Sequence, residues 1–242
     1  MKCVILQPSY IPWRGYFHQI HKADIFIFYD DVMFDKDGWR NRNRIKTVNG
    51  TRWLTIPVTA GPGRQLHATP INLVRTCQEP AWMPVHWKTL QHAYSKAPYF
   101  DRYASMLQSF YRDGAPLLGE FLIQTTLAIS AELGIQHTQF RRSSEIGGTG
   151  TRVGRLINVL KAVGATHYIT GPSAKGYLEE SSFQEAGISL EYMSYNYPEY
   201  RQLHPPFDPQ VSILDLLFML GPEAPDYIWG ATKGSLTAPA QS

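Results

Sequence analysis

The chain has 242 residues, of which 43% are hydrophobic, and this length and composition are enough to bury the core of one α/β domain. Its 23 lysines and arginines against 20 aspartates and glutamates give a formal charge of +3, too small to identify a nucleic-acid-binding protein by itself. No apolar stretch is long enough to span a bilayer, and the opening MKCVILQPSY is too short an apolar run for a signal peptide, so we expect no membrane insertion.

The two cysteines, Cys3 and Cys77, are predicted to be free. Cys3 lies inside an apolar run, which is typical of a small buried hydrophobic residue rather than half of a disulfide. This usage indicates a reducing compartment, and we expect the protein to be cytoplasmic.

The N-terminal part of the chain predicts a βαβ unit. An apolar run at 2–7 is typical of a short buried strand, and the prolines and glycine after it predict a loop. Residues 16–23 carry apolar side chains at helical spacing, and 24–31 is a second apolar strand that ends in carboxylates. Shorter predictions follow: a third strand at 51–59, a loop at 61–70 and a brief fourth strand at 71–74.

The middle of the chain, from about 80 to 133, predicts helices. Three segments are expected, at 81–97, 99–113 and 116–134, and the last ends on Gly134 as a C-cap. Alternation then resumes, with a strand and loop at 135–144, a helix at 151–165, strands at 167–171 and 188–195, and a helix at 211–221. The tail at 234–242 is predicted to be disordered, which leaves residues 1–233 as a single domain.

Alternation at both ends of the chain, with helices between, predicts an α/β fold: a mostly parallel sheet with flanking helices and an inserted or capping helical subdomain. In such sheets ligands bind beyond the carboxyl ends of the strands. Polar or small residues follow the predicted strands at these ends, and we expect them to share one cleft. They are Gln7, Asp30, Asp31, Ser143, Ser144, Gly171 and Pro172.

The stretch DDVMFDKDGWRNRNRIKTVNGTRWLTIPV, at 30–58, mixes tryptophans with alternating arginines and asparagines. A solvated loop face is the simpler interpretation, because charge runs are weak signals. The asparagines and tryptophans favour a ligand-binding segment, since they add donors, acceptors and flat apolar surface to the fixed donors of arginine. This mixture suits an anionic ligand such as a sugar nucleotide, a phosphopantetheine thioester or an RNA terminus. The predicted binding residues are Lys36, Trp39, Asn41, Arg42, Asn43 and Lys46.

Alternation in this stretch has a geometric meaning. If the segment is extended, Asn41 and Asn43 point to one side, while Arg40, Arg42 and Arg44 point to the other. One set would then face the cleft, and the other would face the protein or solvent.

Two loops are further candidates for binding. QPSYIPWRGYF leads from the first strand into a helix, and GPSAKGYL places small residues at a helix start. Either loop can aim backbone N–H groups at a phosphate or serve as a purely structural connection. Neither contains the three-glycine dinucleotide fingerprint or a Walker lysine. The residues proposed for binding are Gln7, Tyr10, Trp13, Gly171, Pro172, Ser173 and Tyr177.

Other kinds of site are disfavoured. His18 and His21 have a spacing that one helix face could use for a metal, but no acidic or cysteine partner accompanies them, so no metal site is predicted. The chain has no G-x-S-x-G elbow, and neither cysteine lies in a recognisable nucleophile context. The sequence therefore indicates no covalent nucleophile and names no cofactor.

Several uncommon words occur in order along the chain: QPSYIPWRGYF, ADIFIFYDDVMFDKDGWRNRNRIK, WLTIPV, YITGPSAKGYL, GISLEYMSYNYPEY and SILDLLF. Together they resemble the successive blocks of the WbqC-like family and extend from Met1 to about Gly221. The resemblance implies a role in bacterial polysaccharide or O-antigen biosynthesis, in glycan or amino-sugar metabolism, and an acyl or aminoacyl transfer to an amine. His18 departs from the family pattern, where an acidic residue is more familiar, so no catalytic role is assigned to it.

The function we expect is an N-acyltransferase that works by direct attack of an amine, with Asp30 or Asp31 as the general base. The expected partners are an anionic small-molecule substrate, either a sugar nucleotide or an acyl donor, with a carrier protein or tRNA as a further candidate donor. An ATP-dependent ligase or nucleotidyl-type enzyme is one alternative, because the same loops would serve ATP. A non-catalytic glycan or RNA binder is another, because 13% of the residues are aromatic and arginines are clustered.

Overall fold

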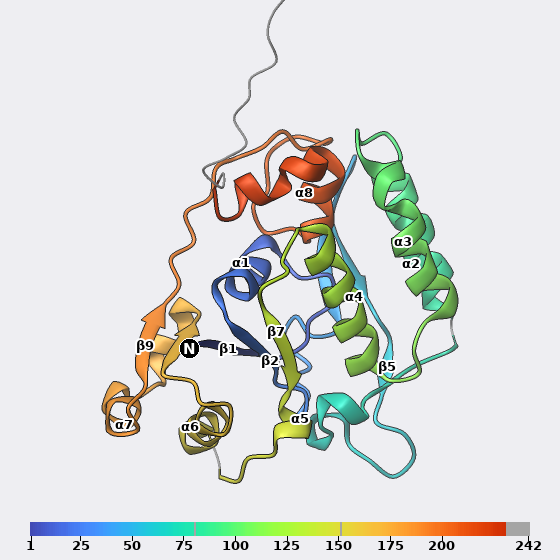
Figure 1. The fold of residues 1–242 in the computed structure, drawn as a ribbon. Coiled ribbons are helices and arrows are strands. Elements are labelled where there is room, and N and C mark those ends of the chain that lie inside the picture. Colours follow the sequence, from blue (N-terminus) through green and yellow to red (C-terminus); the bar gives the residue numbers. More distant parts are fainter. Residues whose placement is uncertain (80, 151, 231–242) are drawn as a thin grey trace, which may run out of the picture.

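The computed structural model describes residues 1–79, 81–150 and 152–230 (Figure 1). The tail predicted at 234–242 lies outside the described residues. Within the described part, no helix has both the length and the apolar composition needed to cross a membrane.

A parallel sheet forms the centre of the fold, with the strand order β7-β2-β1-β8-β9. Its five strands are β1 (Lys2–Leu6), β2 (Ile25–Phe28), β7 (Gln139–Arg142), β8 (His167–Thr170) and β9 (Ser189–Tyr192). The chain builds outward from β1 through β2 to β7, then returns to the other side of β1 for β8 and β9. Every neighbouring pair is parallel, as in the register of Val4 opposite Phe26 and Ile169. The predicted α/β fold class is therefore confirmed, and the sheet has a topological switch point between β1 and β8.

Both faces of the sheet are covered, which explains why β1 and β2 are continuous apolar runs. Cys3 and Ile5 of β1 face one side, where they pack with α6 (Arg152–Ala162) and α7 (Glu180–Glu185). Val4 faces the other side, where α1 (Arg14–Lys22), α4 (Leu118–Glu132) and α8 (Ile213–Leu220) contribute to the larger core (Figure 1). Alternation of side chains along the strand assigns each residue to its layer.

The helices predicted between 80 and 133 are present as α2 (Trp82–Tyr94), α3 (Phe100–Asp113) and α4. Trp87 stacks between Phe100 and Tyr111 at ring-centroid distances of 6.0 and 6.1 Å. Gly134, with φ of +73°, ends α4 as predicted, and its N–H donates to the carbonyl of Ala131.

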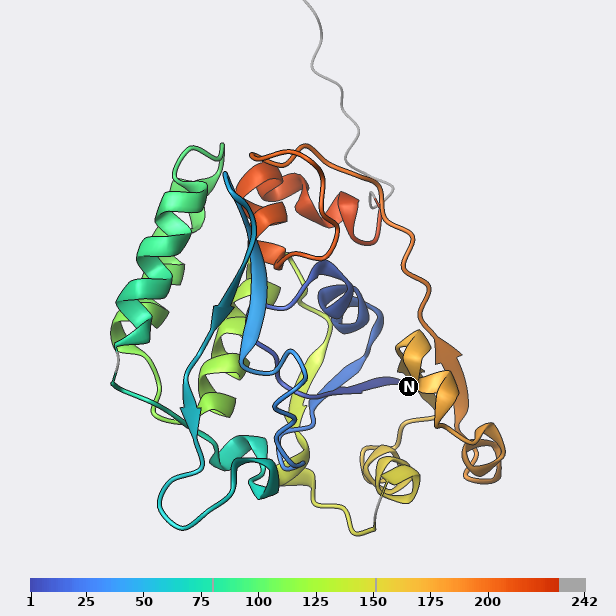
Figure 2. The ribbon, with the colours of Figure 1, turned by 180° about the vertical axis from the view of Figure 1, so that it is seen from behind.

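The strand predicted at 51–59 is present, in two pieces, and neither piece joins the main sheet. Instead β4 (Gly50–Thr55) pairs antiparallel with β3 (Arg42–Thr47), a hairpin that lies between the main sheet and α2 (Figure 2). The segment 71–74 is not a strand but the short 3-10 helix η2 (Ile71–Leu73). The remaining short elements are β5 (Val58–Thr59), η1 (Leu66–Ala68), β6 (Arg75–Thr76), α5 (Ser143–Ile146), η3 (Pro172–Gly176) and η4 (Gly221–Tyr227).

Candidate functional site

Two adjoining cavities lie at the carboxyl ends of β1 and β8, where the strand order reverses. One, of about 510 Å³, is lined by Trp13, Tyr16, Trp39 and Tyr195, and we call it the aromatic lobe. The other, of about 930 Å³, is lined by Asp31 and the arginines 40, 152 and 155, and we call it the charged lobe. Leu6, Arg40, Ser173 and Tyr177 line both lobes. The two lobes therefore share one wall, and together they form a cleft at the switch point of the sheet.

The aromatic lobe is built by the loop after β1 and by the start of α1. Trp13 folds over Gly15, where a Cβ atom would lie only 2.3 Å from the indole ring, so this position requires glycine. The indole packs edge-on against Tyr195 at 4.9 Å, and Gln19 Nε2 donates to the Tyr195 hydroxyl at 2.9 Å. Burial raises the pKa of Tyr195 to about 12. The hydroxyl is therefore a neutral hydrogen-bonding group at ordinary pH.

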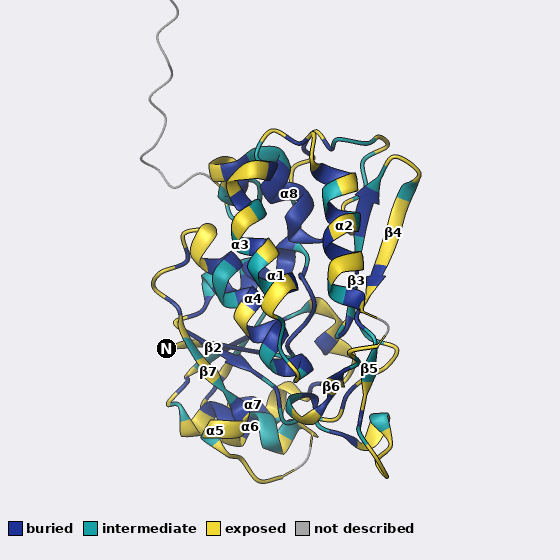
Figure 3. Ribbon diagram, turned by 90° about the vertical axis from the view of Figure 1, so that its right-hand side faces the viewer, coloured by how far each residue is buried: buried dark blue, intermediate teal, exposed yellow. Residues whose placement is uncertain are grey.

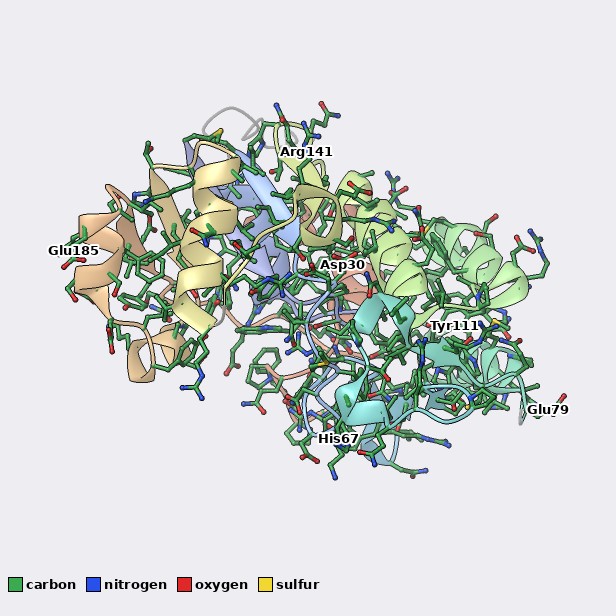
Figure 4. The ribbon with its side chains drawn as sticks, turned by 90° about the horizontal axis from the view of Figure 1, so that it is seen from below. Asp30, His67, Glu79, Tyr111, Arg141 and Glu185 are labelled. Atoms are coloured by element: carbon green, nitrogen blue, oxygen red, sulfur yellow. The ribbon has the colours of Figure 1, made fainter. Side chains whose placement is uncertain are left out.

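Asp30 is buried, with 1% of its surface exposed. Its carboxylate accepts hydrogen bonds from the Ser144 N–H at 3.0 Å and the Ser144 hydroxyl at 2.8 Å. The Ser143 hydroxyl lies 3.2 Å from the same carboxylate and shares its single proton between Asp30 and Asp31. These contacts tie the start of α5 to the end of β2, and Figure 4 shows Asp30 in the interior of the molecule. Ser143 and Ser144 thus contact Asp30, and neither serine lines the cleft.

Asp31 lines the charged lobe. One carboxylate oxygen accepts from the Ser143 hydroxyl, and the other pairs with an Nη atom of Arg155 on α6. Neighbouring residues that follow a strand point in different directions, which is why only one of the two carboxylates reaches the cleft.

Arg155 is a site residue that sequence reasoning missed. Its guanidinium lies over the ring of Tyr29 at 5.1 Å, and its Nε is buried without a hydrogen-bond partner among the described residues. It projects from α6 beside the apolar stripe that packs on the sheet. In the sequence it resembles an ordinary surface arginine, and only its pairing with Asp31 in the folded chain distinguishes it.

Arg40 is the second missed residue, and it lines both lobes. Its Nη1 donates to the Gln7 carbonyl at 3.3 Å and to the Ser9 hydroxyl at 2.8 Å. Burial lowers the pKa of Arg40, although Tyr16 and Asp35 oppose that shift. The sequence alternation grouped it with Arg42 and Arg44; all three are half-buried, but of the three only Arg40 lines the cleft.

The loop after β8 contributes further residues to the wall that the two lobes share. Gly171 and Pro172 line the aromatic lobe, Gln7 lines the charged lobe, and Ser173 lines both. Tyr177, at the end of η3, also lines both lobes and is 67% exposed. The strand ends of β1, β2 and β8 thus place Gln7, Asp31 and Gly171 at one edge of the sheet.

The arginine-asparagine segment alternates as an extended strand does: Asn41 and Asn43 are buried, and Arg42 and Arg44 are half-buried. Asn41 donates to the Ile56 carbonyl at 2.8 Å, and Asn43 donates to the carbonyls of Tyr10 and Ile11 at 3.0 and 2.8 Å. The buried amides therefore bond to the protein backbone.

The remaining predicted residues of this segment lie in different places. Trp39 lines the aromatic lobe and packs edge-on against Trp53 at 4.8 Å. Arg42 donates to the Asp37 carbonyl at 2.7 Å, and Lys46 Nζ donates to the Pro206 carbonyl. Lys36 is exposed and lines neither lobe. Of this segment, Trp39, Arg40 and Asn43 line the cleft.

Tyr10 points away from both lobes into the helical layer. Its hydroxyl lies 2.9 Å from Nδ1 of His86 on α2 and 2.6 Å from the hydroxyl of Tyr111 on α3, on the side where Figure 4 labels Tyr111. His86 is 6% exposed, and burial lowers its pKa to about 4. The loop after β1 is thereby anchored to the helices.

We expect His86 to make the protein less stable in acid. Its pKa falls from 6.5 in the unfolded chain to about 4 in the folded protein, so its contribution is present above 6.5 and is lost as the pH falls towards 4. The full loss corresponds to about 3 kcal/mol, at about 1.4 kcal/mol per pKa unit. Denaturant unfolding of the wild type and of His86→Phe at several pH values checks this. Equal pH dependence of the two proteins would contradict it.

The described residues hold no group of three or more His, Cys, Asp or Glu side chains placed to bind one metal ion. Nδ1 of His18 lies 3.0 Å from the Tyr197 hydroxyl, and the His21 ring stacks on Trp229 at 4.1 Å. These two histidines therefore make separate structural contacts.

Comparison with known proteins finds a relative whose name gives no activity. The uncharacterized protein Rv1507c of Mycobacterium tuberculosis (strain ATCC 25618 / H37Rv) is 40% identical over 232 residues, which cover 94% of this chain and 97% of that protein. No solved structure matches the chain. The model of the WbqC-like protein family matches residues 7–227, a range that includes both walls of the cleft. The chain therefore belongs to the WbqC-like protein family.

Proposed function

We propose that the protein is a transferase that moves an acyl or aminoacyl group from an activated donor to an amine. The observation that carries this proposal is the pair of lobes with one shared wall. A reaction between two substrates needs two binding volumes that meet where the reacting atoms meet, because positioning removes much of the entropic barrier. The glycan context that the family resemblance implies makes an amino sugar the acceptor we expect.

Asp31 is the general base in this proposal, because it is the carboxylate of the pair that lines the cleft. Its bonds to Ser143 and Arg155 fix the carboxylate plane and leave acceptor capacity for an amine N–H. In the reaction, the amine nitrogen bonds to the donor's carbonyl carbon while the bond from that carbon to the leaving oxygen or sulfur breaks. Asp31 takes the amine proton and returns it to the leaving group, so the carboxylate is regenerated.

The lobes receive different substrates in this arrangement. The acceptor amine lies in the charged lobe beside Asp31, and the donor lies in the aromatic lobe with its carbonyl at the shared wall. Arg155 holds Asp31 in place through the ion pair and through its own packing over Tyr29. It is a positioning residue in this proposal.

An ATP-dependent ligase is the second candidate, favoured by the position of the cleft at the switch point of a parallel sheet, where nucleotides bind in many α/β proteins. It would form the same amide but would consume ATP. A protein that only binds a glycan or RNA would bind its ligand without turnover.

The test is an assay of the purified protein with a panel of amino sugars and acyl donors, each with and without ATP, read by mass spectrometry. The proposal expects an amide product, formed without ATP, whose mass is the sum of the acceptor and the acyl group less one hydrogen atom. Product only with ATP would favour the ligase, and binding without product would favour the binding protein. Asp101→Asn, an exposed carboxylate on α3, is the matched control for variants of the cleft.

A further inference from the structure

Arg40 stands apart from the other cations of the cleft. Arg155 is neutralised by its ion pair with Asp31, and Arg152 is exposed to solvent. Among residues 1–79, 81–150 and 152–230, no carboxylate oxygen lies within 4.0 Å of the Arg40 guanidinium. Asp35 affects the pKa of Arg40 only as a more distant charge. A largely buried charge without a counterion is costly, so proteins keep one where a ligand supplies the opposite charge.

The hydrogen bonds of Arg40 leave one nitrogen of its guanidinium, Nη2, available to a ligand. In the described part of the chain, Nη1 makes the bonds to Gln7 and Ser9, and Nε is buried without a partner. Nη2 makes no hydrogen bond within the described residues and is not among the fully buried atoms, so it is the donor left to bind an anionic group in the cleft. The backbone beside it is fixed, because the Arg40 carbonyl accepts from the Tyr10 N–H at 2.9 Å.

The position of Arg40 narrows the choice of ligand. Arg40 lies at the shared wall of the two lobes, at the switch point of a doubly wound sheet. The adjoining lobe presents Trp13, Trp39 and Tyr177, whose rings suit a planar base. An anionic group next to a flat, partly aromatic cavity of about 510 Å³ is the chemistry of a nucleotide.

We infer that Arg40 binds a phosphoryl group of a nucleoside diphosphate at the wall between the two lobes, and that the aromatic lobe holds the nucleoside. The inference rests on the proposed function in one respect only: it treats this nucleotide as a part of the acyl donor. Binding itself is independent of any transfer reaction.

Titration calorimetry with ADP, UDP, adenosine, uridine, pyrophosphate and succinate tests the inference on the full chain. We expect at least one diphosphate nucleotide to bind, with its nucleoside and succinate weaker by more than about tenfold, the effect of one charge-assisted hydrogen bond. Arg40→Gln should raise the Kd of that nucleotide about 10- to 100-fold. Arg112→Gln, an exposed arginine on α3, should leave it unchanged.

Thermal melting without ligand separates a binding role from a structural one. Arg40→Gln removes a charge without a counterion but also the bonds to Gln7 and Ser9, so its melting temperature should stay within a few degrees of that of the wild type. If Arg40→Gln does not fold, Arg40→Lys decides, because it keeps the charge but loses the guanidinium nitrogen that faces the ligand and should still weaken nucleotide binding.

Several results would overturn the inference: no nucleotide binding by the wild type, wild-type affinity in both Arg40 variants, or succinate bound as tightly as the nucleotide. If pyrophosphate binds as tightly as the nucleotide, the nucleoside contributes nothing to the affinity and the aromatic lobe does not hold it. Nucleotide binding through Arg40 with no amide product would retain the inference and refute the proposed transferase, so the two failures can be told apart.

Discussion

Asp31→Asn is expected to lower the rate of amide formation by about two to four powers of ten, the usual contribution of a positioned proton acceptor. The amide side chain has nearly the same shape as the carboxylate but cannot take the amine proton. The variant should keep an affinity for the donor close to that of the wild type, since the proton transfer that it loses matters mainly in the transition state, while loss of the ion pair with Arg155 should lower its melting temperature modestly. Steady-state kinetics with the acceptor and donor found in the assay provide the measurement.

The neighbouring carboxylate is the internal comparison for this prediction. Asp30→Asn should act on stability, because its buried oxygens accept bonds from Ser143 and Ser144, and an amide nitrogen in their place leaves donors facing each other. We expect a loss of about 1–3 kcal/mol in unfolding free energy, with turnover per folded molecule near that of the wild type. If Asp31→Asn turns over at the wild-type rate, the Asp31 carboxylate takes no part in the chemistry.

The central sheet was predictable because its determinants are local. β1 and β2 are apolar on both faces, as strands covered by helices on both sides must be, and each is followed by a loop rich in prolines or carboxylates. The hairpin was harder to predict. The β3 sequence RNRIKT has little apolar character, because its inward side chains are Asn43 and Ile45, and an asparagine that bonds to distant backbone resembles a loop residue in sequence. Figure 3 shows that the outer surface of β4, the other strand of the hairpin, is exposed.

The candidate site divides in the same way. Positions that follow a strand end, such as Gln7, Asp31 and Gly171, could be assigned to one edge of the sheet from the strand pattern and the parallel topology alone. Arg40 and Arg155 could not be assigned, because what makes each unusual is a partner, or the lack of one, that only the folded chain defines. The run of polar residues after Asp30 is ambiguous for a related reason: its asparagines have the chemistry of ligand-binding residues, and in the folded chain their amides bond to the backbone, while Asn43 also lines the aromatic lobe.

Asn43→Ala is therefore expected to destabilise the fold strongly, the reverse of what a ligand-facing asparagine would show. Asn43 is 2% exposed, and its amide joins β3 to the loop after β1 by donating to the Tyr10 and Ile11 carbonyls. Its side-chain oxygen also accepts from the Arg44 N–H at 2.7 Å. Alanine leaves these groups buried without partners, at about 1–3 kcal/mol each, so we expect a total loss of about 2–5 kcal/mol.

The measurement is denaturant unfolding together with thermal melting, where a loss of this size lowers the melting temperature by about 5–15 °C in a chain of this length. Asn49→Ala is the matched control, because Asn49 lies in the exposed turn of the same hairpin and its side chain makes no hydrogen bond within the described residues. If Asn43→Ala melts like Asn49→Ala and loses nucleotide affinity, Asn43 is a ligand contact and the hairpin is held by other means. If it melts early, the asparagine fixes the loop that places Trp13 over the aromatic lobe, and the segment supports the cleft as scaffold, with Trp39 and Arg40 as its contribution to binding.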